Sequence, residues 1–223
     1  MTERATEPVA SGAQATSKEP VKAIADRPAS PPRAWQRMLS GRRLDLLDPS
    51  PLDIEIEDIA HGLSREARWN GQTSGAWAFS VAQHCLLVED LACRFKPRLS
   101  PQWRLAALLH DAAEYVMGDL ITPFKAAVGL DYKAFEKRLM GAVHIRFGLP
   151  AVPPEDLGAL VHRADRMAAY LEAVALAGFS EAEARRIFGR PARLGDIRLE
   201  PWPPDVAKAH YLDRFRIIVE SGI

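Results

Sequence analysis

Four side chains of types that commonly bind metal ions lie within apolar helical stretches of the sequence. His84 occurs in "SVAQHCLLV", His110 and Asp111 form the pair in "ALLHDAAE", and Asp165 occurs in "VHRADRMAAYL". Burying such groups without partners costs several kcal/mol for each charged one. A divalent cation held by all of them removes that cost, and this mixture of nitrogen and oxygen ligands suits Mn, Fe, Co, Ni or Zn, and less specifically Mg. The alternative is helix capping and core hydrogen bonding.

Two carboxylates follow the His-Asp pair. Glu114 is three residues after Asp111, which places both side chains on one face of a continuous helix. We predict that Glu114 contacts water at the cation and transfers a proton; the alternative is a surface glutamate. Asp119 follows Gly118 in a loop, where its side chain could equally fix the turn by local hydrogen bonds.

Two further segments carry groups that suit a phosphorylated substrate. In "ARWNGQT", Arg68 can bind phosphate through two hydrogen bonds, and Trp69 offers a flat apolar face to a sugar or base. The alternative is a core tryptophan beside an ion-paired arginine. Thr122 and Lys125 begin an expected helix, whose N-terminus would attract phosphate; the alternative for Lys125 is an exposed charge.

A helical scaffold is predicted to position these groups. The 3.6-residue period of apolar side chains dominates from Gly75 onward. Pro101 suits the first position of a helix after Ser100. The predicted fold class is all-α, a helical bundle with a small extended or hairpin segment near the N-terminus, in residues 42–56. The expected helices cover residues 57–64, 81–95, 101–118, 132–147, 155–177, 180–188 and 204–220.

Composition limits the remaining classes of function. Lysine plus arginine equals aspartate plus glutamate, 29 each, so nothing indicates a nucleic-acid-binding surface. No apolar run is long enough to span a bilayer, and the N-terminus lacks a secretory signal. Cys85 and Cys93 are about 12 Å apart on one helix, too far for a disulfide, which indicates a reducing cytoplasm. Residues 1–33 are predicted to be a disordered tail, and residues 34–223 a single domain.

The order H…HD…D resembles the signature of the HD superfamily of metal-dependent phosphohydrolases. More narrowly, the chain resembles the bacterial HD-domain 5'-deoxynucleotidase branch, through "RWNG" before the first histidine, Glu114 after the pair and "GDLITPFK" downstream. The resemblance covers roughly residues 58–178. It implies an HD-type helical domain that binds one divalent metal ion.

The resemblance also implies residue roles. It makes His84, His110, Asp111 and Asp165 the metal ligands. It gives Asp119 a role in orienting water or protonating the leaving oxygen, and it places Arg68 and Trp69 in the substrate pocket, with the tryptophan near a deoxyribose. His61 is a candidate for supporting the site, and a dinuclear centre that also uses His144 or His162 is an alternative.

Three functions are compatible with this pattern. The first is hydrolysis of deoxynucleoside 5'-monophosphates to deoxynucleoside and phosphate. The second is hydrolysis of a (deoxy)nucleoside triphosphate at the same metal site, which would need further basic residues. The third is a non-catalytic nucleotide-binding module. The expected last helix carries an apolar stripe that either packs on its own core, which is the simpler choice, or forms a homodimer: Val206, Tyr211, Leu212, Phe215, Ile218 and Val219.

Overall fold

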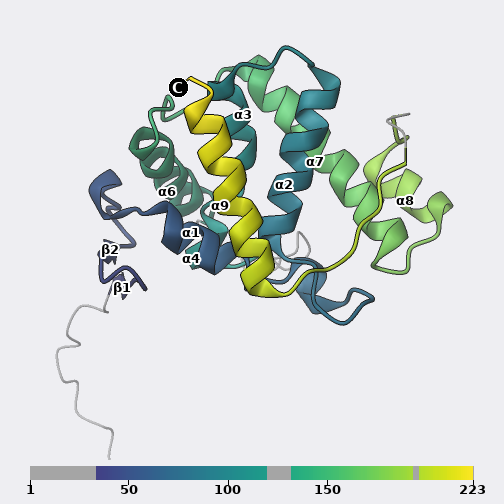
Figure 1. Ribbon diagram of the computed structural model, residues 1–223, viewed down its shortest axis with the longest axis horizontal. Coiled ribbons are helices and arrows are strands. Elements are labelled where there is room, and N and C mark those ends of the chain that lie inside the picture. The colour runs from purple at the N-terminus through teal and green to yellow at the C-terminus, as the bar shows by residue number, and fades with distance from the viewer. Residues whose placement is uncertain (1–33, 120–131, 193–195, 223) are drawn as a thin grey trace, which may run out of the picture. The chain divides into compact units, whose positions relative to one another are not determined.

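The computed structural model describes residues 34–119, 132–192 and 196–222. The predicted disordered tail, residues 1–33, lies outside these described residues. Helices dominate the described part of the chain, and a small antiparallel hairpin lies near its N-terminal end (Figure 1). The predicted fold class, all-α with a small hairpin, is therefore confirmed.

The hairpin begins earlier in the chain than we expected. Strand β1, Trp35–Arg37, pairs with β2, Arg43–Asp45, with Trp35 opposite Asp45. The Arg43 guanidinium lies over the Trp35 ring, 4.5 Å from its centroid. The extended segment predicted in residues 42–56 supplies only the second strand, because its later residues turn at a 3₁₀ helix, η1, Pro51–Asp53.

The helices follow the predicted order closely. Ser80, Ser100 and Ser180 cap the N-termini of α2, α3 and α8, each by accepting a backbone hydrogen bond, which explains why those boundaries are sharp. The described helices are α1 Ile56–Leu63, η2 Arg68–Gly71, α2 Val81–Phe95, α3 Pro101–Leu108, α4 Glu114–Met117, α6 Tyr132–Arg146, α7 Glu155–Ala175, α8 Glu181–Phe188 and α9 Pro204–Glu220.

One predicted helix is broken at the candidate His-Asp pair. The continuous helix expected over residues 101–118 divides into α3 and α4, and His110 and Asp111 lie in the turn between them. Here the backbone N–H of His110 donates to Ala107, and that of Glu114 donates to Asp111. These i→i−3 bonds replace helical i→i−4 bonds. The single-face argument that linked Glu114 to Asp111 is therefore wrong.

Helix α2 is central to the packing. It contacts α3, α7 and α9, and α9 lies beside it in Figure 1. On α9, Tyr211 and Ile218 are fully buried, so the predicted apolar stripe packs on its own core at these positions. Val206 and Val219 are exposed, so packing on the core does not extend to these two residues, and the homodimer alternative stays a prediction.

Two further sequence predictions can be checked against the described residues. Cys85 and Cys93 are both free thiols, as their spacing predicted. None of the helices in the described ranges combines the length and the apolar character that crossing a membrane requires.

Candidate metal centre

The four candidate ligands come from three separate elements. His84 projects from α2, His110 and Asp111 from the turn after α3, and Asp165 from α7. Ligand atoms of His84, His110 and Asp111 all lie within 4.8 Å of one another. Asp165 is outside this group of three, but its Oδ1 lies 3.2 Å from His84 Nε2. The folded chain therefore brings together side chains that are up to 81 residues apart in sequence, the interval from His84 to Asp165.

Hydrogen bonds fix the orientation of both imidazole rings. His84 Nδ1 lies 2.6 Å from Glu172 Oε1, and His110 Nδ1 lies 3.0 Å from the Ala107 carbonyl oxygen. Because an ionised carboxylate and a carbonyl can only accept, each Nδ1 is the donor. In the neutral ring the lone pair is therefore on Nε2, the arrangement by which proteins prepare histidine for a metal.

Both Nε2 atoms are buried and have no hydrogen-bond partner. They nevertheless face the same carboxylate oxygen: Asp111 Oδ2 lies 3.5 Å from His84 Nε2 and 3.2 Å from His110 Nε2. The His84 side chain is fully buried, whereas that of Asp165 is 35% exposed. Buried polar atoms without partners are uncommon and need an explanation, and a cation between them supplies one.

The surrounding carboxylates favour positive charge at this position. Burial would lower the pKa of His84, but Glu172 and Asp165 raise it above its ordinary value. Burial likewise opposes the charged form of His110, yet Asp111 raises its pKa well above the ordinary value. Burial would raise the pKa of the Asp111 carboxyl, but the charge of His110 lowers it far below its usual range. The donor set and its charge therefore fit a divalent cation.

Glu172 is a residue that sequence reasoning missed. It is fully buried on α7, where its Oε2 accepts hydrogen bonds from Trp69 Nε1 at 2.9 Å and from Arg68 Nε at 3.4 Å. Burial would raise its pKa, but the charges of His84 and Arg68 lower it to about 2. The available signal was its place seven residues, or two helical turns, after Asp165, within an otherwise apolar stretch.

Arg68 is held by carboxylates beside the cluster. Its Nη1 donates to Asp119 Oδ2 at 3.0 Å and its Nε to Glu172. Burial would lower the pKa of Arg68, but Glu172 and Asp119 raise it above its usual range. Asp111 and Glu114 shift it further in the same direction, so both carboxylates are close enough to act on this guanidinium. The predicted phosphate contact of Arg68 stays a prediction, because its charge is already paired.

The two predicted catalytic carboxylates lie near this arginine. Glu114 is buried at the start of α4, so the alternative of a surface glutamate is wrong. The backbone N–H of Asp119 donates to Glu66 Oε1 at 3.0 Å, and its side chain is 9% exposed. The Asp119 side chain therefore points at Arg68, and a neighbouring glutamate holds its backbone. Their catalytic roles stay predictions.

Trp69 is placed by its packing and by its backbone. Its ring packs against Phe179 and Phe188, with centroids 5.6 and 6.0 Å away. Its φ of 58° is left-handed, as is the φ of 50° at Asn70, and left-handed non-glycine residues are uncommon and often occur at functional sites. In this orientation Trp69 Nε1 donates to Glu172, and the predicted contact of Trp69 with a deoxyribose stays a prediction.

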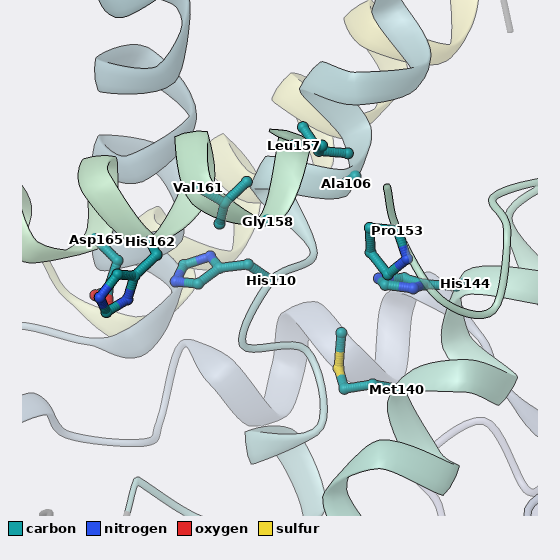
Figure 2. Close-up of a pocket in the computed structure, with 10 residues that line it drawn as sticks. All are labelled: Ala106, His110, Met140, His144, Pro153, Leu157, Gly158, Val161, His162 and Asp165. Atoms are coloured by element: carbon teal, nitrogen blue, oxygen red, sulfur yellow. The ribbon is translucent and has the colours of Figure 1, made fainter. Parts of the chain in front are cut away.

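A cavity of about 260 Å³ opens beside the cluster and is lined by His110, Asp165, His144 and His162, among others. Figure 2 shows His162 with Asp165 on one side of the His110 ring and His144 with Pro153 on the other. His61 lies in α1, where burial and the charges of Arg65 and Lys208 lower its pKa, and its predicted support of the site stays a prediction.

Only two of the four predicted substrate contacts lie within the described residues. Arg68 and Trp69 are absent from the described residues that line the 260 Å³ cavity. Thr122 and Lys125, together with the helix expected to begin there, lie outside the described residues. Their predicted phosphate contacts therefore stay predictions.

Comparison with known proteins gives a relative without an assigned activity. No protein-family model matches the chain. An uncharacterized protein of Rhodobacter capsulatus is 60% identical to it over 193 residues, which cover 85% of this chain and 97% of the relative. At that identity and coverage, the chain belongs to the same family as the Rhodobacter capsulatus protein.

Proposed function

We propose that this chain is a metal-dependent phosphohydrolase of the HD superfamily that converts deoxynucleoside 5'-monophosphates to deoxynucleosides and phosphate. One observation carries the proposal: two buried imidazole Nε2 atoms without hydrogen-bond partners converge on the carboxylate of Asp111. The order of His84, the His110–Asp111 pair and Asp165 in the sequence adds the resemblance to HD phosphohydrolases.

In this proposal, His84, His110, Asp111 and Asp165 hold one divalent ion, with Mn, Co, Fe, Ni, Zn and Mg as candidates. A divalent ion lowers the pKa of coordinated water towards neutrality and so supplies the nucleophile for phosphorus. Glu172 keeps the Nε2 atom of His84 directed at the ion, because its Oε1 accepts the proton of Nδ1. Hydrolysis then also requires groups that transfer protons and a positive charge near the substrate phosphate.

Three other side chains perform those tasks in the proposal. Glu114, buried next to the His-Asp turn, accepts the proton released by the attacking water. Glu114 then returns this proton to the leaving oxygen, and Asp119, which Arg68 holds by an ion pair, orients the attacking water. Arg68 keeps a positive charge beside the reaction, which favours the added negative charge of the transition state.

The size of the cavity favours a small substrate. Its volume of about 260 Å³ is close to the lower end of the range for small-molecule sites, which suits a monophosphate better than a triphosphate. The alternatives are the (deoxy)nucleoside triphosphate and the non-catalytic nucleotide-binding module. We also propose a cytoplasmic location, where free thiols such as Cys85 and Cys93 are maintained.

A phosphate-release assay tests this function. The metal-depleted full chain is reloaded with each candidate metal and given a panel of deoxynucleoside mono- and triphosphates. Free phosphate from the monophosphates supports the proposal, whereas pyrophosphate or triphosphate release supports the triphosphate alternative. Tight nucleotide binding without turnover at any metal supports the non-catalytic alternative. Asp213→Asn, on the exposed face of α9, is the matched control for Asp111→Asn, and only the latter should abolish activity.

Glu114→Gln separates proton transfer from metal binding. The variant should keep the ion and lose about 100-fold or more in kcat, since general acid–base catalysis contributes that much. Full activity in Glu114→Gln would reject the role of this residue, and a loss of the ion would show that it acts on metal binding instead.

A further inference from the structure

A second cavity, of about 500 Å³, lies on another face of α7 and has no role in the proposed hydrolysis. Its rim carries Arg163 and Arg166 from α7 and Arg190 from the segment after α8. No aspartate or glutamate is among the described residues that line it. We call this cavity, with its three arginines, the arginine groove.

The three guanidinium groups are available to a ligand. Within the described ranges, none of Arg163, Arg166 and Arg190 forms an ion pair with a carboxylate, and all three are exposed. This differs from Arg68, whose charge is already paired with Asp119 and Glu172. Like charges gathered on one rim repel one another, so an anion that binds several of them is favoured.

Two of these arginines lie against other parts of the groove. The Arg163 guanidinium lies over the Phe95 ring, 4.0 Å from its centroid. Gly189 has a left-handed φ of 92°, and a Cβ there would lie 3.4 Å from Arg166 Nη2. A side chain at position 189 would therefore be strained by this backbone conformation, and the Arg166 guanidinium lies close to this loop.

The floor of the groove is apolar. Met167 and Tyr170 are buried there, and Phe188 adds a partly buried ring. An apolar floor under a cationic rim suits a planar ring that carries phosphate, because the ring gains from burial and the phosphate from paired guanidinium groups. The volume of the groove is within the usual range for small-molecule sites.

We propose that the arginine groove is a second ligand site, which binds an organic phosphate with a planar ring, of the nucleotide class, separately from the metal centre. His162 lines both the groove and the cavity beside His110 and Asp165. A ligand in the groove therefore contacts a side chain that also borders the metal cavity, which gives the two sites a physical connection.

Calorimetric titration of the full chain tests the proposal, with ADP, pyrophosphate and adenosine as probes and EDTA present so that no metal ion bridges the phosphates. The variants are the double substitution Arg163→Glu and Arg166→Glu, the metal-centre variant Asp111→Asn, and Arg186→Glu. The last is the control, since it makes one such Arg-to-Glu substitution on α8 at an exposed residue outside the groove, with half the charge change of the double variant.

The expected result is that ADP binds to the wild-type chain, to Arg186→Glu and to Asp111→Asn with similar affinity. The double variant should bind ADP about tenfold more weakly or worse, since each lost charge-assisted hydrogen bond is worth that much. Pyrophosphate should bind more weakly than ADP, and adenosine more weakly still.

Several results would overturn the proposal. These are no binding of ADP to the wild-type chain at millimolar concentration, equal affinity of ADP and adenosine, or unchanged ADP affinity in the double variant. Loss of ADP binding in Asp111→Asn alone would assign the nucleotide to the metal centre and reject the groove as its site, whatever the outcome of the phosphate-release assay.

Discussion

His84 and Glu89 are both fully buried side chains of helix α2, but only Glu89 has partners for all of its polar atoms. Glu89 accepts hydrogen bonds from Arg104 Nε at 2.6 Å and from Cys93 Sγ at 3.2 Å, and it also pairs with Arg214. His84 has its Nδ1 satisfied by Glu172, whereas its Nε2 has no hydrogen-bond partner.

The difference distinguishes a structural ion pair from a binding site. The Glu89 cluster, which consists of Glu89, Arg104, Arg214 and Cys93, connects α2, α3 and α9 and provides partners for both oxygens of the carboxylate. A buried charge is tolerated only with such partners. Around His84, in contrast, polar atoms lie close together and the Nε2 atom has no hydrogen-bond partner, which indicates that a further group binds there.

The largest expected effect concerns the Glu89 cluster. Glu89→Ala leaves the Arg104 and Arg214 charges without their buried partner, so the free energy of unfolding should fall by about 3–5 kcal/mol. Urea denaturation measures this loss. The neighbouring Asp90→Ala is the matched control, because Asp90 is exposed and pairs with the same Arg214; it should cost about 1 kcal/mol or less. Equal effects of the two substitutions would contradict the structural role of Glu89.

Cys93 reports the charge of Glu89. Burial and the adjacent Glu89 carboxylate raise the pKa of Cys93 from 9.0 to about 11. Because only the thiolate reacts, alkylation of Cys93 by iodoacetamide at pH 8 should be about 100-fold slower in the folded chain than in urea. The rate should increase up to about pH 11, and mass spectrometry identifies the modified cysteine. Equal rates in the folded and unfolded chains would reject this environment.

Glu172→Gln tests whether Glu172 orients His84 for binding the ion. The substitution keeps the size of the side chain and removes the charge that orients His84, so affinity for the ion should fall about 10–100-fold. Calorimetric titration with Mn²⁺ or Co²⁺ measures it. Glu181→Gln makes the same change at an exposed ion pair on α8 and should leave the affinity unaltered. If both variants bind the ion as the wild-type chain does, Glu172 has no role in orienting His84.

The smallest expected effect is that of Trp69→Phe. Phenylalanine keeps a ring for the contacts with Phe179 and Phe188 but removes the donor to Glu172. The free energy of unfolding should fall by about 1 kcal/mol, and metal affinity should fall less than in Glu172→Gln. A larger loss of affinity than in Glu172→Gln would show that Trp69 acts on the ion by another route.

The helices were predictable because periodicity and caps are local signals. Ser100 with Pro101 marked the start of α3, and Ser80 caps α2 one residue before its predicted start. The break at His110 and Asp111 was not predictable from those signals. Leu109, Ala112 and Ala113 remain buried through the turn, so the apolar pattern continues as though the helix did.

The candidate ligands were predictable from the sequence, whereas the residues that hold and orient them were not. His84, His110, Asp111 and Asp165 are conspicuous as polar groups in apolar runs. Glu172 and the ion pairs of Arg68 depend on contacts more than 50 residues apart in sequence, and no local pattern encodes which carboxylate an arginine will meet. Such pairings arise only when α2, α7 and the "RWNG" turn come together.

The central claim is that His84, His110, Asp111 and Asp165 bind one divalent ion, and metal titration of the depleted full chain tests it most directly. We predict one ion per wild-type chain and a rise in Tm of about 5–10 °C at a metal concentration of 100 Kd. Asp213→Asn should behave as the wild-type chain does, and Asp111→Asn should show neither the bound ion nor the rise in Tm. An equal stoichiometry and Tm shift in Asp111→Asn, or no bound ion in the wild-type chain with any of the six candidate metals, would contradict the claim.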